Sequence, residues 1–111
     1  MKVLLFSNDG CGSCKKWKPL FEKLMKDYNL EYQVLDMYDP RNKEMKEKYG
    51  IQGIPDTIFT NDEGEEIGHV LGNMVEDLAR SQIEYYISTC QQTTKNTRTT
   101  SCYMYGTTST A

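Results

Sequence analysis

The residues with the clearest chemical potential are two cysteines close together in the sequence. Cys11 and Cys14 enclose Gly12 and Ser13, and two thiols at this spacing can form a disulfide or bind a metal ion. A short apolar run precedes the pair and a helical pattern follows it, so the pair lies where a strand gives way to a helix. That position, more than the spacing alone, indicates redox chemistry.

A helix N-terminus changes the reactivity of a cysteine. Backbone N–H groups without helical partners and the positive end of the helix dipole stabilise an anion there, so Cys11 is expected to react as a thiolate with a pKa below about 8.5. Cys14 falls on the apolar face of the helix, three residues before Trp17. These positions predict an exposed nucleophile at Cys11 and a shielded resolving thiol at Cys14, which would displace a substrate bound to Cys11 as a mixed disulfide.

Two other uses of the pair are less favoured by the sequence. A CxxC segment can be half of a four-cysteine zinc site, but eleven residues separate Cys90 from Cys102, and the one histidine, His69, falls on an expected strand. The other alternative is that the two thiols are purely structural. Packing alone does not explain why Gly and Ser stand between them at the start of a helix. We therefore expect no metal at this pair.

Hydrophobic periodicity places the pair within an α/β domain. The pattern predicts strands over residues 2–7, 31–38, 56–60 and 65–72, and helices over residues 14–28, 40–49 and 73–87. Asn73, with Glu76 three residues later, is expected to begin the last helix. Its expected apolar stripe consists of Val75, Leu78, Ala79, Ile83, Tyr86 and Ile87. The order of these elements predicts a four-stranded mixed sheet flanked by helices on both faces.

The composition divides the chain into a body and a tail. Hydrophobic residues make up 38% of the 111 residues, and the shortage lies in residues 89–111, where nine of 23 residues are Thr. A segment so poor in apolar side chains cannot bury enough surface to fold alone. The prediction is one domain over residues 1–88 and a Thr-rich, disordered C-terminal tail over residues 89–111.

Charge, length and hydropathy exclude several classes of function. The net charge of −3 and the absence of a basic region in the body argue against nucleic-acid binding. No apolar stretch approaches the ~18 residues of a membrane span, and no signal peptide is evident, so we expect a cytoplasmic protein without a membrane partner. The domain is too small for two lobes around a dinucleotide and has no Gly-rich phosphate motif, so we expect no cofactor.

Two segments resemble the thioredoxin family. The run CGSCKKWKP over residues 11–19 and the run YGIQGIP over residues 49–55 are similar to the CGPCK and YGIxxxP segments of that family, and the resemblance covers residues 2–88. It implies the thioredoxin-like fold and a thiol-disulfide oxidoreductase that reduces protein disulfides. It also implies a cis bond before Pro55 and a substrate-docking surface made of Gly12, Ser13, Ile54, Pro55, Leu71 and Gly72. The implied partners are disulfide-containing proteins and an electron donor of the thioredoxin-reductase type, and the chain is expected to be a monomer.

The sequence also departs from the thioredoxin pattern. Only ten residues precede Cys11, so the chain resembles the minimal, glutaredoxin-sized fold that lacks the family's first strand and helix. Leu5 stands where thioredoxins have a buried Asp that assists proton transfer at the resolving thiol, so another base or water must act here. Ser13 replaces the Pro of CGPC, and Asp56 stands where a Thr or an apolar residue often follows the cis proline.

Two alternatives to a thioredoxin-type reductase remain at this stage. One is a glutaredoxin-type enzyme that uses glutathione, although the segment from Leu71 to Met74 lacks the Gly-Gly-x-x-Asp pattern of glutaredoxins. The other is a binding module on a thioredoxin scaffold, in which the dithiol is incidental. His69 is interpreted as a packed or edge residue rather than a catalytic base, and Trp17 as a core residue.

Overall fold

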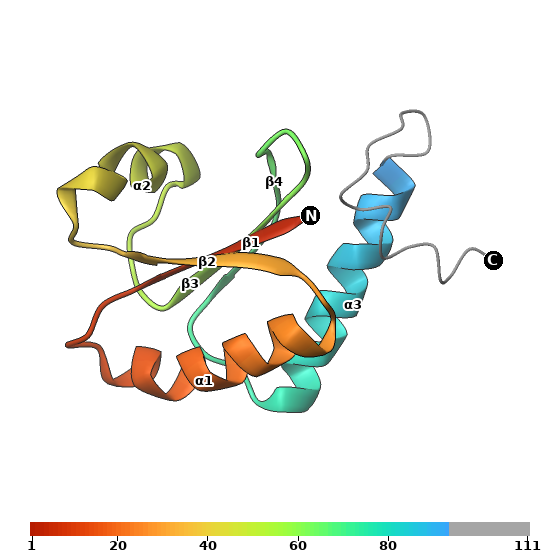
Figure 1. Ribbon diagram of the computed structural model, residues 1–111, viewed down its shortest axis with the longest axis horizontal. Helices are drawn as coiled ribbons and strands as arrows, with labels where there is room; N and C mark the ends of the chain where they lie inside the picture. The colour runs from red at the N-terminus through yellow and green to blue at the C-terminus, as the bar shows by residue number, and fades with distance from the viewer. Residues whose placement is uncertain (94–111) are drawn as a thin grey trace.

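The structure, a computed structural model, describes the backbone of residues 1–93 and the side chains of residues 1–89. Four strands form one sheet: β1 (Lys2–Ser7), β2 (Glu31–Asp36), β3 (Asp56–Thr60) and β4 (Glu66–Leu71). Three helices flank it: α1 (Gly12–Asp27), α2 (Lys43–Tyr49) and α3 (Glu76–Thr93), with a 3-10 turn at Pro40–Asn42 before α2. These elements follow the predicted order, and Figure 1 shows their arrangement.

The sheet has the strand order β2-β1-β3-β4. Strand β1 pairs in parallel with β2 and antiparallel with β3, and β3 pairs antiparallel with β4. The predicted four-stranded mixed sheet is therefore confirmed. This topology brings the carboxyl ends of β1, β2 and β4 and the amino end of β3 to the same end of the sheet, at the left in Figure 1.

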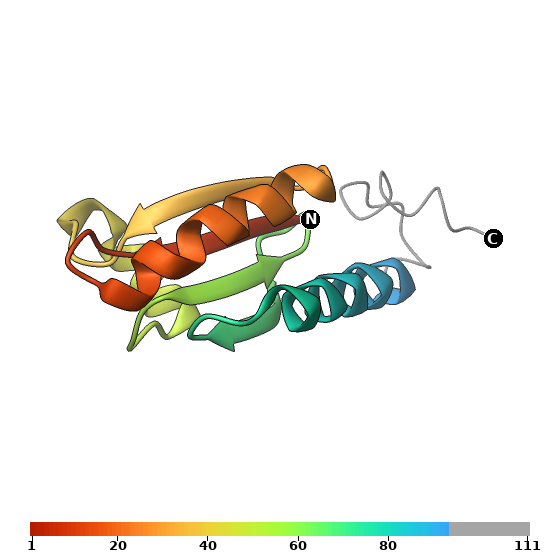
Figure 2. The same ribbon diagram turned by 90° about the horizontal axis from the view of Figure 1, so that it is seen from below.

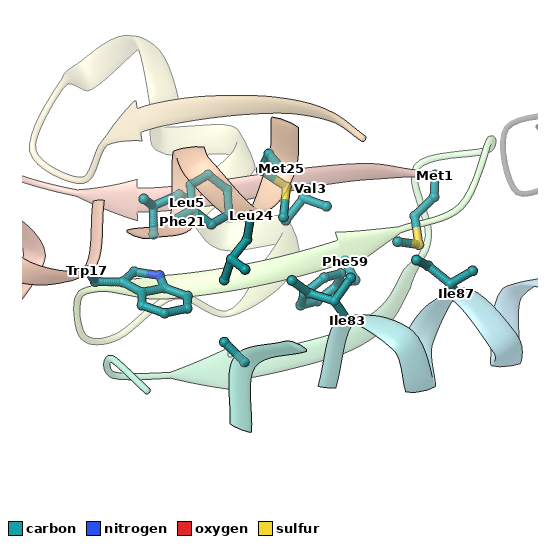
Figure 3. Close-up of a cluster of buried hydrophobic side chains, with 11 residues drawn as sticks. Met1, Val3, Leu5, Trp17, Phe21, Leu24, Met25, Phe59, Ile83 and Ile87 are labelled. Carbon is teal, nitrogen blue, oxygen red and sulfur yellow. The ribbon is translucent and has the colours of Figure 1, made fainter. Parts of the chain in front are cut away.

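Helices α1 and α3 cover one face of the sheet and α2 covers the other, as Figures 1 and 2 show together. The larger core cluster lies between the sheet and the two long helices (Figure 3). Its members include Trp17, Phe21, Leu24, Met25, Phe59 and Ile83. The smaller cluster lies on the α2 face and consists of Leu4, Phe6, Leu35, Tyr49, Ile51 and Ile58. Alternate residues of β1 thus enter opposite clusters, as the continuous apolar run of a strand buried on both faces requires.

Helix α1 has the predicted amphipathic character. Its buried residues are Cys14, Trp17, Phe21, Leu24 and Met25, which recur at steps of three and four. The helix ends at Asp27, and Asn29 then adopts a left-handed conformation with φ of 55°. Asn tolerates that conformation because its short polar side chain can bond locally. The structure thus confirms that Cys14 lies on the apolar face of this helix and that the helix ends close to residue 28.

Helix α3 differs from the prediction at its start. It begins at Glu76 rather than at Asn73, and its first helical hydrogen bond runs from the Ala79 N–H to the Val75 carbonyl, at 3.0 Å. Ala79, Ile83 and Ile87 are buried, whereas Val75 is 72% and Leu78 is 49% exposed. Because Ala79, Ile83 and Ile87 recur at steps of four, they define the buried face of the helix, and Leu78 lies about a quarter turn away from that face. Val75 is exposed because it precedes the helix. The capping box and two members of the predicted stripe were therefore wrong.

The other end of α3 also passes the expected boundary. The helix continues beyond Ser88 to Thr93, because no Gly or Pro interrupts this stretch. The domain boundary that we placed after residue 88 thus falls inside α3. The remainder of the expected tail, residues 94–111 with Cys102, lies outside the described residues. None of the helices over residues 1–93 has the length and apolar composition that a membrane-spanning segment requires.

Close packing holds α3 against the sheet. A Cβ atom on Gly68 of β4 would overlap the ring of Tyr86, so glycine is needed for the helix to approach this strand. The Tyr86 ring lies 4.6 Å from that of Phe59, measured between centroids. Arg80 of α3 contacts Asp27 at the end of α1 at 2.8 Å. These contacts fix both long helices on one side of the sheet.

Candidate active site

The cysteine pair occupies the turn between β1 and α1, as predicted. Cys11 is the N-cap of α1, and its sulfur accepts a hydrogen bond from the Cys14 backbone N–H at 3.1 Å. The two cysteines form a disulfide, with Cα atoms 5.2 Å apart. The same N–H would stabilise a thiolate on Cys11 in the reduced protein, together with the positive end of the helix dipole. The structure therefore places Cys11 where an anionic sulfur is favoured.

The two sulfurs differ in their access to solvent. Cys14 is 3% exposed and lies on the buried face of α1, whereas Cys11 is half-buried. Gly12 and Ser13, between them, are exposed. A disulfide that approaches from solvent therefore meets Cys11 before Cys14.

An open hollow of about 260 Å³ adjoins Cys14. It is lined by Ser7, Asn8, Asp9, Cys14, Lys15, Lys18 and Pro19. Leu5, by contrast, is fully buried and offers no group that could exchange a proton. The polar side chains in the lining of the hollow give water a route to the neighbourhood of Cys14 that the core does not provide.

A buried hydrogen bond joins the cysteine helix to the strand that follows the proline. The indole N–H of Trp17 donates to the hydroxyl of Thr57 at 3.0 Å, and both residues are at most 2% exposed. Trp17 lies three residues after Cys14, and Thr57 lies two residues after Pro55. Trp17 is a core residue, as expected, but its polar partner was not predicted. The bond fixes α1 relative to the start of β3.

The structure brings the predicted docking residues to the sheet end that carries the cysteines. The Ile54–Pro55 peptide bond is cis, which is the isomer that the family resemblance implies. The Gly72 N–H donates to the Pro55 carbonyl at 2.7 Å, and this bond joins the segment before β3 to the segment after β4. Gly72 has φ of +93°, a conformation that side chains disfavour. Leu71 beside it is 65% exposed.

A buried ion pair lies directly behind these docking segments. Nε2 of His69 is 2.6 Å from Oδ1 of Asp56, and the Asp56 side chain is only 2% exposed. Nδ1 of His69 faces Glu66 at 3.2 Å. No donor among the described residues makes an aligned hydrogen bond to Oδ1 of Asp56. The positive charge of protonated His69 therefore compensates the negative charge of this buried oxygen. Sequence reasoning missed this pair, although an acidic residue in the apolar strand DTIFT was a signal for it.

The surroundings shift the protonation of both partners. Burial raises the pKa of the Asp56 carboxyl above its usual range, and the nearby His69 opposes that rise. Burial disfavours the charged imidazole, but Asp56 and Glu66 outweigh this effect and raise the pKa of His69. The imidazolium form of His69 is thus the form that these two carboxylates favour.

The remaining candidates have simpler environments. Lys15, Lys16 and Lys18 are exposed on α1 and form a solvated face. No group of three side chains suited to metal binding occurs among the described residues. The side chain of Cys90 and all of Cys102 lie outside what the structure describes.

Comparison with known proteins identifies related chains. The family model described as "Thioredoxin" matches residues 1–90. The thioredoxin of Pseudomonas aeruginosa is 29% identical over 77 residues, which cover 69% of this chain and 67% of that protein.

Solved structures show the same architecture. Thioredoxin 1 from Thermosipho africanus superposes with a TM-score of 0.68 at 24% identity, over 82% of this chain and 99% of that one. The thioredoxin of Fasciola hepatica gives a TM-score of 0.66 at 28% identity, over 77% of this chain and 79% of that one. The fold of the described residues is thus shared with these proteins.

Proposed function

The chain belongs to the thioredoxin family, and from this premise we propose that it is a thiol-disulfide oxidoreductase that works in the reducing direction on protein disulfides. Its class, a thiol-disulfide oxidoreductase, follows from the family and from the Cys11–Cys14 pair. One observation carries the assignment of roles: Cys11 is the half-buried N-cap of α1, whereas Cys14 is buried one turn further along.

The first step would be attack by the Cys11 thiolate on a substrate disulfide. A bond forms between the Cys11 sulfur and one substrate sulfur, and the substrate S–S bond breaks. The other substrate sulfur leaves as a thiolate and takes a proton from water. The Cys14 N–H, 3.1 Å from the Cys11 sulfur, keeps the attacking thiolate populated before this step.

The second step would release the substrate. Cys14 loses its proton and attacks the Cys11 sulfur, which forms the intramolecular disulfide and frees the second substrate thiolate. Two electrons pass from the protein dithiol to the substrate. Because Leu5 offers no base, we propose that the Cys14 proton leaves to water in the hollow lined by Asp9, Lys15 and Lys18.

The docking surface would be Gly12, Ser13, Ile54, Pro55, Leu71 and Gly72. The Pro55 side chain is fully buried, so it would shape this surface from beneath and not contact a substrate itself. Strand β3 pairs with its neighbours from Asp56 onward, so Ile54 precedes the ladder and could pair with an extended substrate segment. The exposed Leu71 side chain would contact apolar substrate groups. This surface lies at the same sheet end as Cys11, which supports its assignment.

The partners are proposed at the level of chemical class. The substrates would be proteins that contain disulfides, and a reductase of the thioredoxin-reductase type would restore the dithiol. Action as a monomer in the cytoplasm remains a prediction from the sequence.

Insulin reduction with dithiothreitol as the electron donor tests the proposal. The Cys11→Ser/Cys14→Ser variant should reduce insulin no faster than dithiothreitol alone, whereas a binding module would show no catalysis even in the wild-type chain. The equilibrium reduction potential of the pair decides the direction. A value near about −270 mV, as thioredoxins have, supports a reductase, and one near about −120 mV would indicate an oxidant.

A further inference from the structure

The ion pair between Asp56 and His69 has no role in the steps above. Asp56 follows Pro55 directly, and its register partner across the β3–β4 ladder is Leu71. Its carboxylate is almost fully removed from solvent, whereas the His69 side chain is 30% exposed. A buried carboxylate without aligned donors costs stability unless a cation compensates it. The protein thus keeps a destabilising carboxylate directly beside the proposed docking surface.

We propose that Asp56 and His69 are positioning residues that hold the docking segments of β3 and β4 together, and so set the affinity for protein disulfides without taking part in the thiol chemistry. The proposal rests on the proposed function of this surface. It specifies which side chains keep the surface in its binding form.

The geometry connects the ion pair to the docking backbone. Asp56 is one residue from Pro55, and His69 is three residues from Gly72. The bond from the Gly72 N–H to the Pro55 carbonyl, at 2.7 Å, joins the same two segments just beyond the ion pair. A contact of 2.6 Å between side chains of adjacent strands restrains their separation, and therefore the geometry of that backbone bond.

The charged groups around the pair make its strength depend on pH. Among the described residues, those that act on His69 are Asp56 of β3 and Glu66 of β4, and those that act on Asp56 are His69 and Glu66. Phe6, the register partner of Asp56 in β1, and Ile58, the register partner of His69 in β3, are apolar and fully or almost fully buried. When His69 loses its proton, Asp56 keeps a buried charge, and Glu66 is the other charged group among the described residues that acts on it. The amino end of β3 and the carboxyl end of β4 then move apart, or water enters between them.

Enzyme kinetics provide the first test. For each protein, kcat/KM is measured for insulin and for hydroxyethyl disulfide between about pH 5.5 and pH 9, a range that spans a raised histidine pKa. The ratio of the two values cancels the ionisation of Cys11, since both substrates need the same thiolate. In the wild-type protein this ratio should fall about fivefold as His69 deprotonates, through a rise in KM for insulin, as expected for a partly exposed pair.

Variants separate positioning from a general structural role. His69→Gln should show the low ratio at every pH, and Asp56→Asn/His69→Gln, which replaces the charges by two amides, should restore the ratio and remove its dependence on pH. Arg41→Gln, which breaks the exposed pair with Asp39, is the matched control and should behave as the wild type. If His69→Gln lowers both kcat/KM values equally, or neither, the proposal is wrong.

A readout that does not depend on activity gives the second test. In NMR spectra of the isotope-labelled oxidised protein, the Gly72 amide should shift with the same midpoint as the imidazole of His69. The Gly64 amide, which bonds to the Asn61 carbonyl at the other end of the hairpin, is the control and should not follow it. A Gly72 amide that ignores the His69 titration would overturn the positioning role. If the wild-type protein reduces neither disulfide, the proposed function fails, and the Gly72 titration alone decides this inference.

Discussion

Substitution of Thr57 by Val tests how the cysteine helix is held against the sheet. The hydroxyl of Thr57 accepts the indole N–H of Trp17 at 3.0 Å, and both side chains are almost fully buried. Val has nearly the shape of Thr but no acceptor. The variant therefore keeps the packing of the larger core cluster and leaves one buried N–H without a partner.

The expected cost follows from that one donor. A buried polar group that loses its partner costs about 1–3 kcal/mol, and the methyl group of Val recovers a small part of this. We expect the free energy of unfolding to fall by about 1–2 kcal/mol. For a domain of this size each kcal/mol lowers the melting temperature by about 4–8 °C.

Urea unfolding followed by circular dichroism measures the effect on the oxidised protein. The Trp17→Phe variant is the second arm of a double-mutant cycle, because it removes the donor instead of the acceptor. In the Trp17→Phe background, Thr57→Val should cost almost nothing, so the coupling energy should be about 1–2 kcal/mol. If Thr57→Val is as stable as the wild type, or costs the same in both backgrounds, this bond does not hold α1 to β3.

Three further predictions concern the site. In the reduced protein, iodoacetamide should alkylate Cys11 before Cys14, with an apparent pKa below about 8.5 by peptide mass spectrometry; faster labelling of Cys14 would reverse the assigned roles. The folded protein raises the pKa of His69. Protonated His69 therefore stabilises the fold fully below about pH 6.5, and this stabilisation is lost as the pH rises through the pKa of His69 in the folded protein. The melting temperature should therefore fall over that range, and a profile unchanged in His69→Gln would contradict this. Gly72→Ala should cost about 1–2 kcal/mol because φ is +93°, whereas Gly12→Ala, whose added Cβ meets nothing within 4 Å, should cost nothing in urea unfolding.

The cysteine site was predictable because its determinants are local. The apolar run of β1, the turn after it and the spacing of apolar residues in α1 all lie within the first 28 residues. These patterns alone place Cys11 at a helix start and Cys14 on the buried face. The structure agrees on both positions.

The ion pair behind the docking surface was not predictable in the same way. Asp56 and His69 are 13 positions apart in sequence, and their contact depends on the register that places Asp56 opposite Leu71. A shift of one residue in that register would move the side chains of one strand to the opposite face. Sequence periodicity gives the faces of each strand but does not fix the register of the hairpin.

The start of α3 shows a second limit. Asn73 and Glu76 have the spacing of a capping box, yet the helix begins at Glu76. Local capping preferences are worth only about 1 kcal/mol. The burial of Ala79, Ile83 and Ile87 sets the position of this helix instead, and that burial depends on the whole sheet.

Trapping of the mixed disulfide tests the central claim most directly. Reduced Cys14→Ser and Cys11→Ser variants are each mixed with insulin, quenched in acid and analysed by non-reducing gel electrophoresis and mass spectrometry. Cys14→Ser should accumulate a covalent adduct through Cys11, because it keeps the attacking sulfur and lacks the resolving one. Cys11→Ser should accumulate none. An adduct through Cys14 in the Cys11→Ser variant, or no adduct through Cys11 in the Cys14→Ser variant, would contradict the assignment of Cys11 as the nucleophile of a protein-disulfide reductase.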